Sequence, residues 1–130
     1  MAFVYKADPV RGAEWARLFA AKAPEIPFHI WPDTGDAQCV RYLAAWQPPV
    51  GIKRQFPNLE ILFSTGAGID QFDLAALPPE LPIVRLAEPG VVAGMVEYAT
   101  MSVLALHRDL PTYIRQQREA HWAAHRIYPA

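Results

Sequence analysis

Short apolar runs that alternate with helical or turn-forming segments constrain the fold of this 130-residue chain more than any other feature. Each run is rich in β-branched and aromatic residues and is bounded by turn formers, which is typical of a buried strand. Because strands that alternate with helices build parallel sheets, this order predicts an α/β fold with a doubly wound parallel sheet of about five strands. The runs lie at residues 1–7, 28–31, 40–46, 59–63 and 83–86.

Helices are predicted between these runs. Asp8 has the side chain of an N-cap and Pro9 suits a first helical turn. We therefore expect a helix over residues 10–23, which Pro24 ends. A second, short helix is expected over residues 50–55.

A different pattern begins after Gly90, where apolar residues recur at steps of three and four. This spacing predicts one apolar stripe along a long helix, formed by Val92, Val96, Ala99, Val103, Leu106 and Leu110. Pro111 interrupts the pattern, and a second helix is expected over residues 112–122. An exposed stripe of this size indicates an interface. We therefore expect two parts, residues 1–90 and residues 91–130.

Composition and charge exclude several classes of function. Hydrophobic residues make up 52% of the chain and charged residues 19%, which is typical of a globular protein. The net charge is −1 and no Lys/Arg cluster is present, so we expect no nucleic-acid partner. No signal peptide follows Met1, and no apolar run comes near the ~18 residues of a membrane span, so we expect no membrane partner. These features favour a cytoplasmic protein.

Residues 63–70 hold the strongest candidate for a binding site. The apolar run 59–63 ends there in a small-residue loop around Gly66, Ala67 and Gly68. Glycine allows a positive φ and lets a ligand approach bare N–H groups, and a nest of such groups suits a small carboxylate. Loops 46–49 and 88–90 also follow strands. Since the binding loops of a doubly wound sheet lie beyond the carboxyl ends of its strands, we expect the three loops to converge.

Simpler interpretations of these residues stay open. Residues 66–68 also fit an ordinary tight loop after a strand. Asp70 is better explained as the cap of the turn at 71–74 than as a functional carboxylate. Trp46 lines a site or belongs to the core, since tryptophans are largely buried on average.

The sequence predicts neither a metal site nor a reactive thiol. His121 and His125 would share one face of a helix, but no third ligand accompanies them, so we expect solvated histidines and no bound metal. The single Cys39 cannot form an internal disulfide, which fits a reducing compartment. Arg41 is its only basic neighbour, and such surroundings do not favour a thiolate nucleophile.

In order and spacing, five segments together resemble the N-terminal part of the D-2-hydroxyacid dehydrogenases, and most of all the glyoxylate/hydroxypyruvate reductase A branch. These segments are residues 46–49, 59–70, 83–86, 96–99 and 104–108. The resemblance covers residues 40–130 and, loosely, residues 1–39. Its most specific motif is the loop that runs from Gly66 to Asp70.

The resemblance implies a fold and an activity. Residues 1–90 would form a flavodoxin-like substrate domain, and residues 91–130 a crossover helix and dimerisation segment that leads into a Rossmann domain absent from this sequence. Such enzymes reduce small 2-oxo acids, here glyoxylate or hydroxypyruvate, with NADH or NADPH. The family's catalytic arginine, glutamate and histidine and its cofactor loop would follow Ala130. This chain alone is therefore expected to be inactive, with no catalytic residue and no cofactor site.

The resemblance also implies roles for single residues. The loop residues that would bind the substrate carboxylate are Gly66, Ala67, Gly68 and Ile69. Trp46 would line the pocket. Residues 91–122 would build a homodimer interface, and Trp122 would approach the site of the partner subunit.

Two other functions stay open. A phosphoglycerate-dehydrogenase-like enzyme would differ only in its substrate, which nothing in this sequence decides. A non-catalytic, flavodoxin-like binding module would require that the protein naturally ends near Ala130. The apolar character of residues 92–122 argues against such a lone module.

Overall fold

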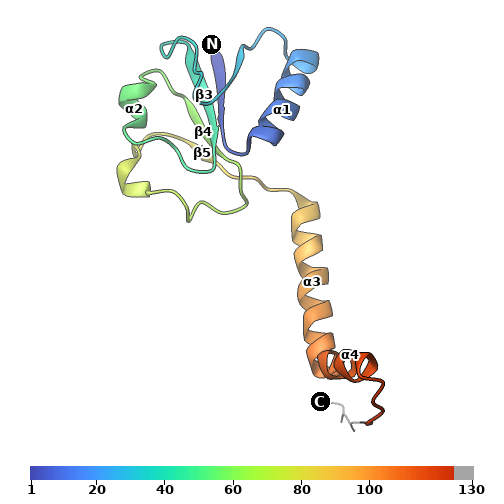
Figure 1. Cartoon of the computed structure of the whole chain (residues 1–130). Coiled ribbons are helices and arrows are strands. Elements are labelled where there is room, and N and C mark those ends of the chain that lie inside the picture. The colour runs from blue at the N-terminus through green and yellow to red at the C-terminus, as the bar shows by residue number, and fades with distance from the viewer. Residues whose placement is uncertain (125–130) are drawn as a thin grey trace. The chain divides into compact units, whose positions relative to one another are not determined.

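The computed structural model describes residues 1–124, and the chain divides into two compact units, Met1–Ala87 and Glu88–Ala130. Figure 1 shows the elements of both units. The first unit is an α/β domain, and the described part of the second consists of two helices.

The first unit is built on a parallel sheet, with five strands in the described part of the chain: β1 (Ala2–Lys6), β2 (Phe28–Ile30), β3 (Val40–Ala45), β4 (Ile61–Ser64) and β5 (Ile83–Val84). The strand order is β2-β1-β3-β4-β5, and each neighbouring pair is parallel. This is the order of flavodoxin-like doubly wound sheets. The predicted fold class is therefore confirmed.

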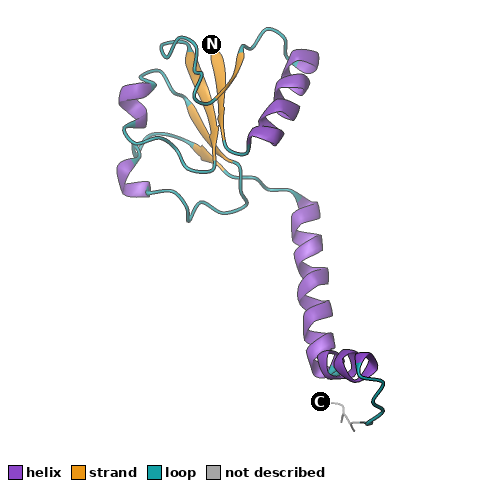
Figure 2. Cartoon of the chain, viewed as in Figure 1, coloured by secondary structure: helices purple, strands orange, loops and turns teal. Residues whose placement is uncertain are grey.

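Helices cover both faces of this sheet, as Figure 2 shows. On one face lies α1 (Pro9–Lys22), whose Trp15 and Phe19 pack against Phe3 and Tyr5 of β1. The ring centroids of Phe3 and Phe19 are 4.9 Å apart, and those of Tyr5 and Trp15 are 5.2 Å apart. Tilted rings at such distances are favourable aromatic pairs, so aromatic packing fixes α1 on the sheet.

The opposite face of the sheet holds an aliphatic core. Val4, Leu43 and Leu62, from three neighbouring strands, are fully shielded from solvent. They pack in one cluster with Ile52 of the short helix α2 (Ile52–Gln55) and with Phe56, which directly follows it. Because successive residues of a strand point to opposite faces, β1 contributes to both cores.

The sequence signals for α1 are confirmed. The Asp8 carboxylate accepts a hydrogen bond from the backbone N–H of Arg11 at 2.8 Å, as an N-cap does. The helix ends at Lys22, before Pro24. The predicted strand 83–86 is shorter than expected and ends at Val84, because β5 is an edge strand that pairs only with β4.

The described part of the second unit contains α3 (Pro89–His107) and α4 (Leu110–Arg118). Asp109 separates them in a left-handed conformation, with φ of 52°. The second helix was predicted over 112–122, but it begins earlier, at Leu110, because Pro111 occupies its first turn, where no N–H is needed, and it ends earlier, at Arg118.

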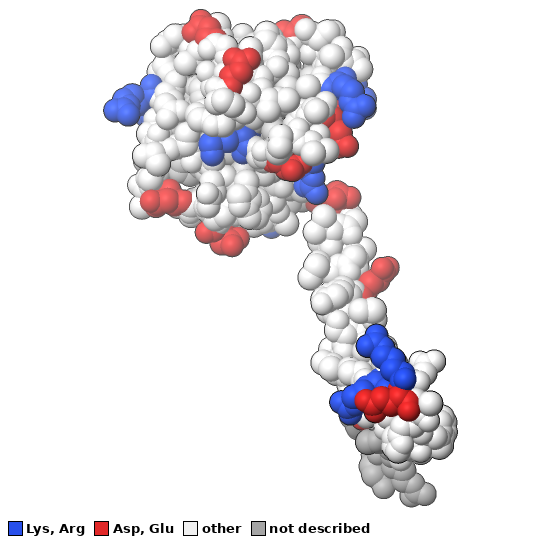
Figure 3. Space-filling model, viewed as in Figure 1, with Lys and Arg blue, Asp and Glu red and all other residues white. Residues whose placement is uncertain are grey.

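Apolar residues occur around the whole circumference of α3. No residue of this helix is buried within the described chain, and Val92, Tyr98 and Leu106 are 65%, 62% and 71% exposed. Tyr98 and Leu104 lie outside the predicted stripe, so the expectation of a single apolar stripe is wrong. Figure 3 shows that charged residues are rare on the visible face of this helix.

By length and composition alone, α3 is also long and apolar enough to cross a membrane, the one such helix among residues 1–124. The expectation that no apolar segment reaches this length is therefore wrong. Small and hydroxylated residues interrupt the large apolar ones without adding charge, and Glu97 is the only Asp, Glu, Lys or Arg in the helix. Helices in the core of a soluble protein have the same composition, so this is weak evidence for a membrane span.

Candidate functional site

The loop that follows β4 lies at the carboxyl edge of the sheet. The Thr65 N–H donates to the carbonyl of Ala45 at 3.2 Å, and the Leu86 N–H donates to the carbonyl of Gly66 at 3.1 Å. These bonds connect the loop to the chain at the ends of β3 and β5. The carboxyl edge of a doubly wound sheet is where such folds bind ligands.

All three carbonyl groups of residues 66–68 accept hydrogen bonds from within the domain. Besides the Leu86 N–H, the Ser64 hydroxyl lies within hydrogen-bond distance of the Gly66 and Gly68 carbonyl oxygens, at 3.1 and 2.8 Å. The Arg85 guanidinium donates to the Ala67 carbonyl at 3.2 Å. The carbonyl groups of the loop are thus held by the protein itself.

Ser64 is at the centre of this network and is 5% exposed. Besides its contacts with the carbonyls, its oxygen accepts from the Gly66 N–H at 3.1 Å and from the Gln71 side-chain amide at 3.0 Å. No sequence pattern predicts a role for Ser64. The available signal was a serine at the last position of an otherwise apolar strand, where a buried hydroxyl needs partners.

The N–H groups of Ala67 and Gly68, in contrast, have no hydrogen-bond acceptor among residues 1–124. Both residues are exposed. Two adjacent exposed N–H groups, with their loop's carbonyls held elsewhere, form a donor pair suited to an anion. The carboxylate nest and the ordinary tight loop both stay predictions for residues 66–68.

The reason for glycine in this loop differs from the expected one. Neither Gly66 nor Gly68 has a positive φ; among the described glycines only Gly35 and Gly51 do. A Cβ atom on Gly66 would lie 2.9 Å from the Trp46 ring, and one on Gly68 would collide with the Asp70 carboxylate. A larger residue at either position would therefore require the Trp46 ring or the Asp70 carboxylate to shift.

Trp46 lies beside the loop and is 53% exposed, so it is not a plain core residue. Ile69 is partly buried, and its side chain packs against the aliphatic core and thereby anchors the end of the loop. Trp122 belongs to the second unit and is 89% exposed. Residues Pro89 and Gly90 of the third predicted loop begin α3 in the same unit.

Asp70 does not act as the expected cap. Its carboxylate has no hydrogen bond to the turn at 71–74 among the described residues and instead lies against Gly68. The turn is closed by the Phe72 N–H, which donates to the Ile69 carbonyl at 3.0 Å. The Asp70 carboxylate therefore lies next to the loop residue Gly68.

Of the two histidines predicted to share a helix face, only His121 lies among the described residues. The backbone N–H of His121 donates to the carbonyl of Gln116 at 2.9 Å, and His125 lies outside the described residues. No group of three metal-ligating side chains occurs among residues 1–124. Cys39 is exposed, and its thiol donates to the Asp36 carboxylate at 3.4 Å.

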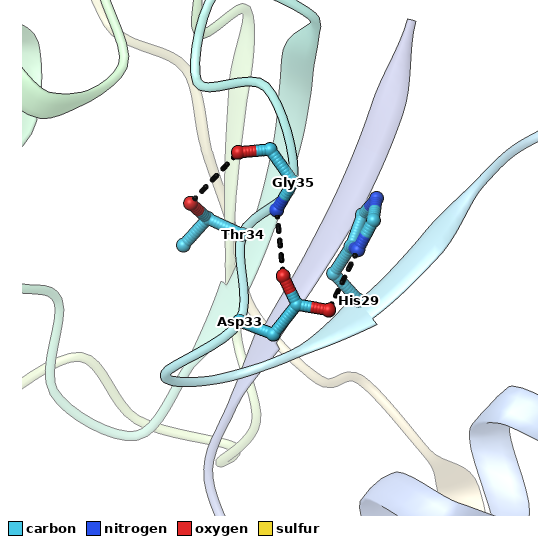
Figure 4. Close-up of polar contacts among 4 residues, drawn as sticks. All are labelled: His29, Asp33, Thr34 and Gly35. Atoms are coloured by element: carbon cyan, nitrogen blue, oxygen red, sulfur yellow. Dashed lines mark hydrogen bonds and ion pairs between the residues drawn. The ribbon is translucent and has the colours of Figure 1, made fainter.

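A second polar cluster follows β2 (Figure 4). The Asp33 carboxylate accepts from the Gly35 N–H at 2.9 Å and lies 3.3 Å from the His29 ring nitrogen Nδ1. The Gly35 hydrogen bond, and then the His29 contact, lower the pKa of Asp33. Gly35 has a φ of 56° and leaves no room for a Cβ beside His29, so this cluster fixes a turn.

In fold and sequence, the chain is similar to D-isomer specific 2-hydroxyacid dehydrogenases, and the resemblance found in the sequence is thereby confirmed. Among curated relatives, glyoxylate/hydroxypyruvate reductase A of Yersinia enterocolitica is 30% identical over 115 residues, which is 84% of this chain and 36% of the relative. No family model matches the chain.

Solved structures agree with this similarity. A D-isomer specific 2-hydroxyacid dehydrogenase from Xanthobacter autotrophicus Py2, in complex with NADPH and MES, is 33% identical with a TM-score of 0.77. A probable 2-hydroxyacid dehydrogenase from Rhizobium etli CFN 42, in complex with NADP, HEPES and L(+)-tartaric acid, is 25% identical with a TM-score of 0.79. The match covers 99% and 98% of this chain but only 42% and 41% of those proteins. The chain thus spans less than half the length of these relatives.

Proposed function

We propose that this chain forms the substrate-carboxylate part of a cytoplasmic NAD(P)H-dependent reductase that converts a small 2-oxo acid to the 2-hydroxy acid, with glyoxylate or hydroxypyruvate as substrate. The observation that carries the proposal is that the N–H groups of the exposed residues Ala67 and Gly68, at the carboxyl edge of the sheet, have no acceptor among residues 1–124. The names of the relatives supply the reaction class.

The roles of the residues follow from their chemistry. The Ala67 and Gly68 N–H groups donate to the two oxygens of the substrate carboxylate, and hydrogen bonds to a charged acceptor are the stronger kind. Gly66 keeps the loop close to Trp46, whose half-exposed ring gives the site an apolar wall. Ile69 anchors the end of the loop in the core. Together these residues hold the acid by its carboxylate and leave the oxo group free for the reaction.

The cofactor is NADPH or NADH, which supplies the hydride in this class of reaction. Residues 1–124 do not offer a fitting site at the first helix of the sheet. The Asp8 carboxylate already occupies the N-terminus of α1, and Pro9 there lacks an N–H. A pyrophosphate at this helix would meet a negative charge in place of free N–H donors. We assign the cofactor site and the catalytic residues to a part of the enzyme outside this sequence.

We further propose that residues 91–122 bind a second copy of the chain, with Trp122 near the partner's site. The support is the apolar surface of α3, where exposed residues such as Val96 and Leu104 would be covered in a dimer. Replacing Leu104 with glutamate should shift sedimentation toward the monomer. Glu14→Gln on the exposed surface of α1 is the control and should leave the association unchanged.

The reaction itself is tested with the natural protein that contains this sequence, by following NADPH oxidation in the presence of glyoxylate or hydroxypyruvate. Gly68→Ala places a Cβ against the Asp70 carboxylate and should raise KM by about tenfold, the loss of roughly one hydrogen bond to a charged group. Ala75→Ser, in the exposed 3-10 turn η1 (Leu74–Ala76), is the control and adds one atom away from the loop. Absence of turnover with every small 2-oxo acid would refute the proposal.

A further inference from the structure

Arg85 contacts the loop that we propose to bind the substrate carboxylate. It follows β5 directly and donates from its guanidinium to the carbonyl oxygen of Ala67, at 3.2 Å. This is the only hydrogen bond to that carbonyl among residues 1–124. The carbonyl of the peptide between Ala67 and Gly68 is therefore held by a single exposed side chain.

The peptide bond between Ala67 and Gly68 links this contact to the nest. It is a trans peptide, since the only cis bond of the described chain lies between Trp31 and Pro32. In a trans peptide the C=O and the N–H point in opposite directions. By fixing the Ala67 oxygen on one side, the guanidinium directs the Gly68 N–H to the other side and polarises it as a donor.

The charge of Arg85 is also uncompensated. No carboxylate forms an ion pair with it in the described part of the chain, where the ion pairs join His29 to Asp33, Arg41 to Glu60 and Lys53 to Glu80. A guanidinium has five N–H donors and stays protonated at every relevant pH. It therefore adds a permanent positive potential beside the nest and opposes the negative charge of Asp70.

We propose that Arg85 is a positioning residue for substrate binding: it holds the 67–68 peptide so that the Gly68 N–H faces the carboxylate, and its charge favours an anion there. This inference rests on the proposed function of the loop. Part of the affinity for the carboxylate then comes from Arg85, which follows β5, whereas the loop itself follows β4.

The inference is tested by calorimetric titration with glyoxylate of the natural protein that contains this sequence, as the parent and as three variants. Arg85→Met keeps the apolar stem and should weaken binding by about fivefold, the equivalent of one hydrogen bond. Arg85→Lys keeps a charge and a donor and should stay within about twofold of the parent. Arg17→Met removes a comparable exposed charge from α1 and should leave the affinity unchanged.

A second readout separates positioning from general stability. In the ligand-free chain, the amide resonance of Gly68 should move in Arg85→Met and stay in place in Arg17→Met, with equal unfolding free energies for both variants. If the parent binds glyoxylate and Arg85→Met binds it equally well, the role of Arg85 is refuted and the proposed function stands. If the parent itself binds no 2-oxo acid, the proposed function of the loop fails, and this inference fails with it.

Discussion

Apolar side chains are buried in the sheet but exposed on α3. Val4, Leu43 and Leu62 in the sheet are completely shielded, whereas Val92 and Leu106 in α3 are more than half exposed. The sheet is covered on both faces by helices of its own unit, so its apolar residues stabilise the fold without a partner. The helix carries apolar residues around its circumference and has no buried residue, and exposed apolar surfaces of this size are typical of interaction sites.

This contrast predicts opposite costs for the same truncation. Leu43→Ala should lower the free energy of unfolding of the chain by about 3 kcal/mol, because it removes buried methyl groups and leaves a cavity. Leu106→Ala, at 71% exposure, should change it by less than about 0.5 kcal/mol. Urea unfolding of dilute protein measures both. Similar losses at the two positions would contradict the contrast.

The buried polar network of the sheet unit gives the next largest effect. Ser64→Ala should lower the free energy of unfolding by about 1–3 kcal/mol, since it leaves the Gln71 side-chain amide and the Gly68 carbonyl without their partner. The same variant should weaken glyoxylate binding because the loop loses its fixed shape. Ser102→Ala in α3 is the control: its hydroxyl only bonds the Tyr98 carbonyl within the exposed helix. Equal stability losses for both serines would refute the central place of Ser64.

The charge of Asp70 should affect how tightly the loop binds a carboxylate. Its carboxylate lies against Gly68 and repels a second carboxylate bound at the nest. Asp70→Asn should therefore increase glyoxylate affinity about threefold at low salt, and less at high salt, because nearby exposed charges interact by only about 1 kcal/mol and are screened. Asp73→Asn, also exposed, is the control for net charge. Weaker binding after Asp70→Asn would mean that the carboxylate supports the loop.

The smallest effect concerns the turn at Asp33. Its pKa in the folded chain is below the ordinary value of 3.8, first because of the Gly35 N–H and then because of His29. A lowered folded pKa contributes stability above the unfolded pKa, and this stability is lost as the pH falls through the folded pKa. In the parent, the urea concentration at the unfolding midpoint should therefore decrease as the pH is lowered below about 4. In Asp33→Asn this decrease should be smaller. Identical acid profiles for the two proteins would refute the role of the turn.

Much of the fold follows from local signals in the sequence. Asp8 and Pro9 mark the start of α1, and Pro24 its end, because capping and proline geometry act over a few residues. The strands follow from short apolar runs, since a strand buried on both faces must be apolar throughout. The end of β5 was less well predicted because it depends on pairing with β4. The start of α4 was also less well predicted, because a first helical turn accepts Pro111.

The binding site in the loop after β4 stays a prediction, whereas the hydrogen bonds of this loop could be described only from the tertiary structure. The small residues after β4 indicated a loop that binds an anion. The role of Ser64 depends on hydrogen bonds with Gly68 and Gln71 that no spacing rule describes. The contact of Arg85 with Ala67 joins two strand ends that are distant in sequence. The reason for Gly66 and Gly68, the space taken by Trp46 and Asp70, likewise required tertiary structure.

The most direct test of the account is a heteronuclear NMR titration of the isotope-labelled chain with glyoxylate. We predict saturable shifts of the Ala67 and Gly68 amides, with smaller shifts at the Trp46 indole, and no change at the exposed α1 residues Glu14 and Arg17. Acetamide, which is uncharged, should leave the spectrum unchanged. Shifts that avoid residues 66–68, or that spread equally over the surface, would contradict the claim that this loop binds the carboxylate.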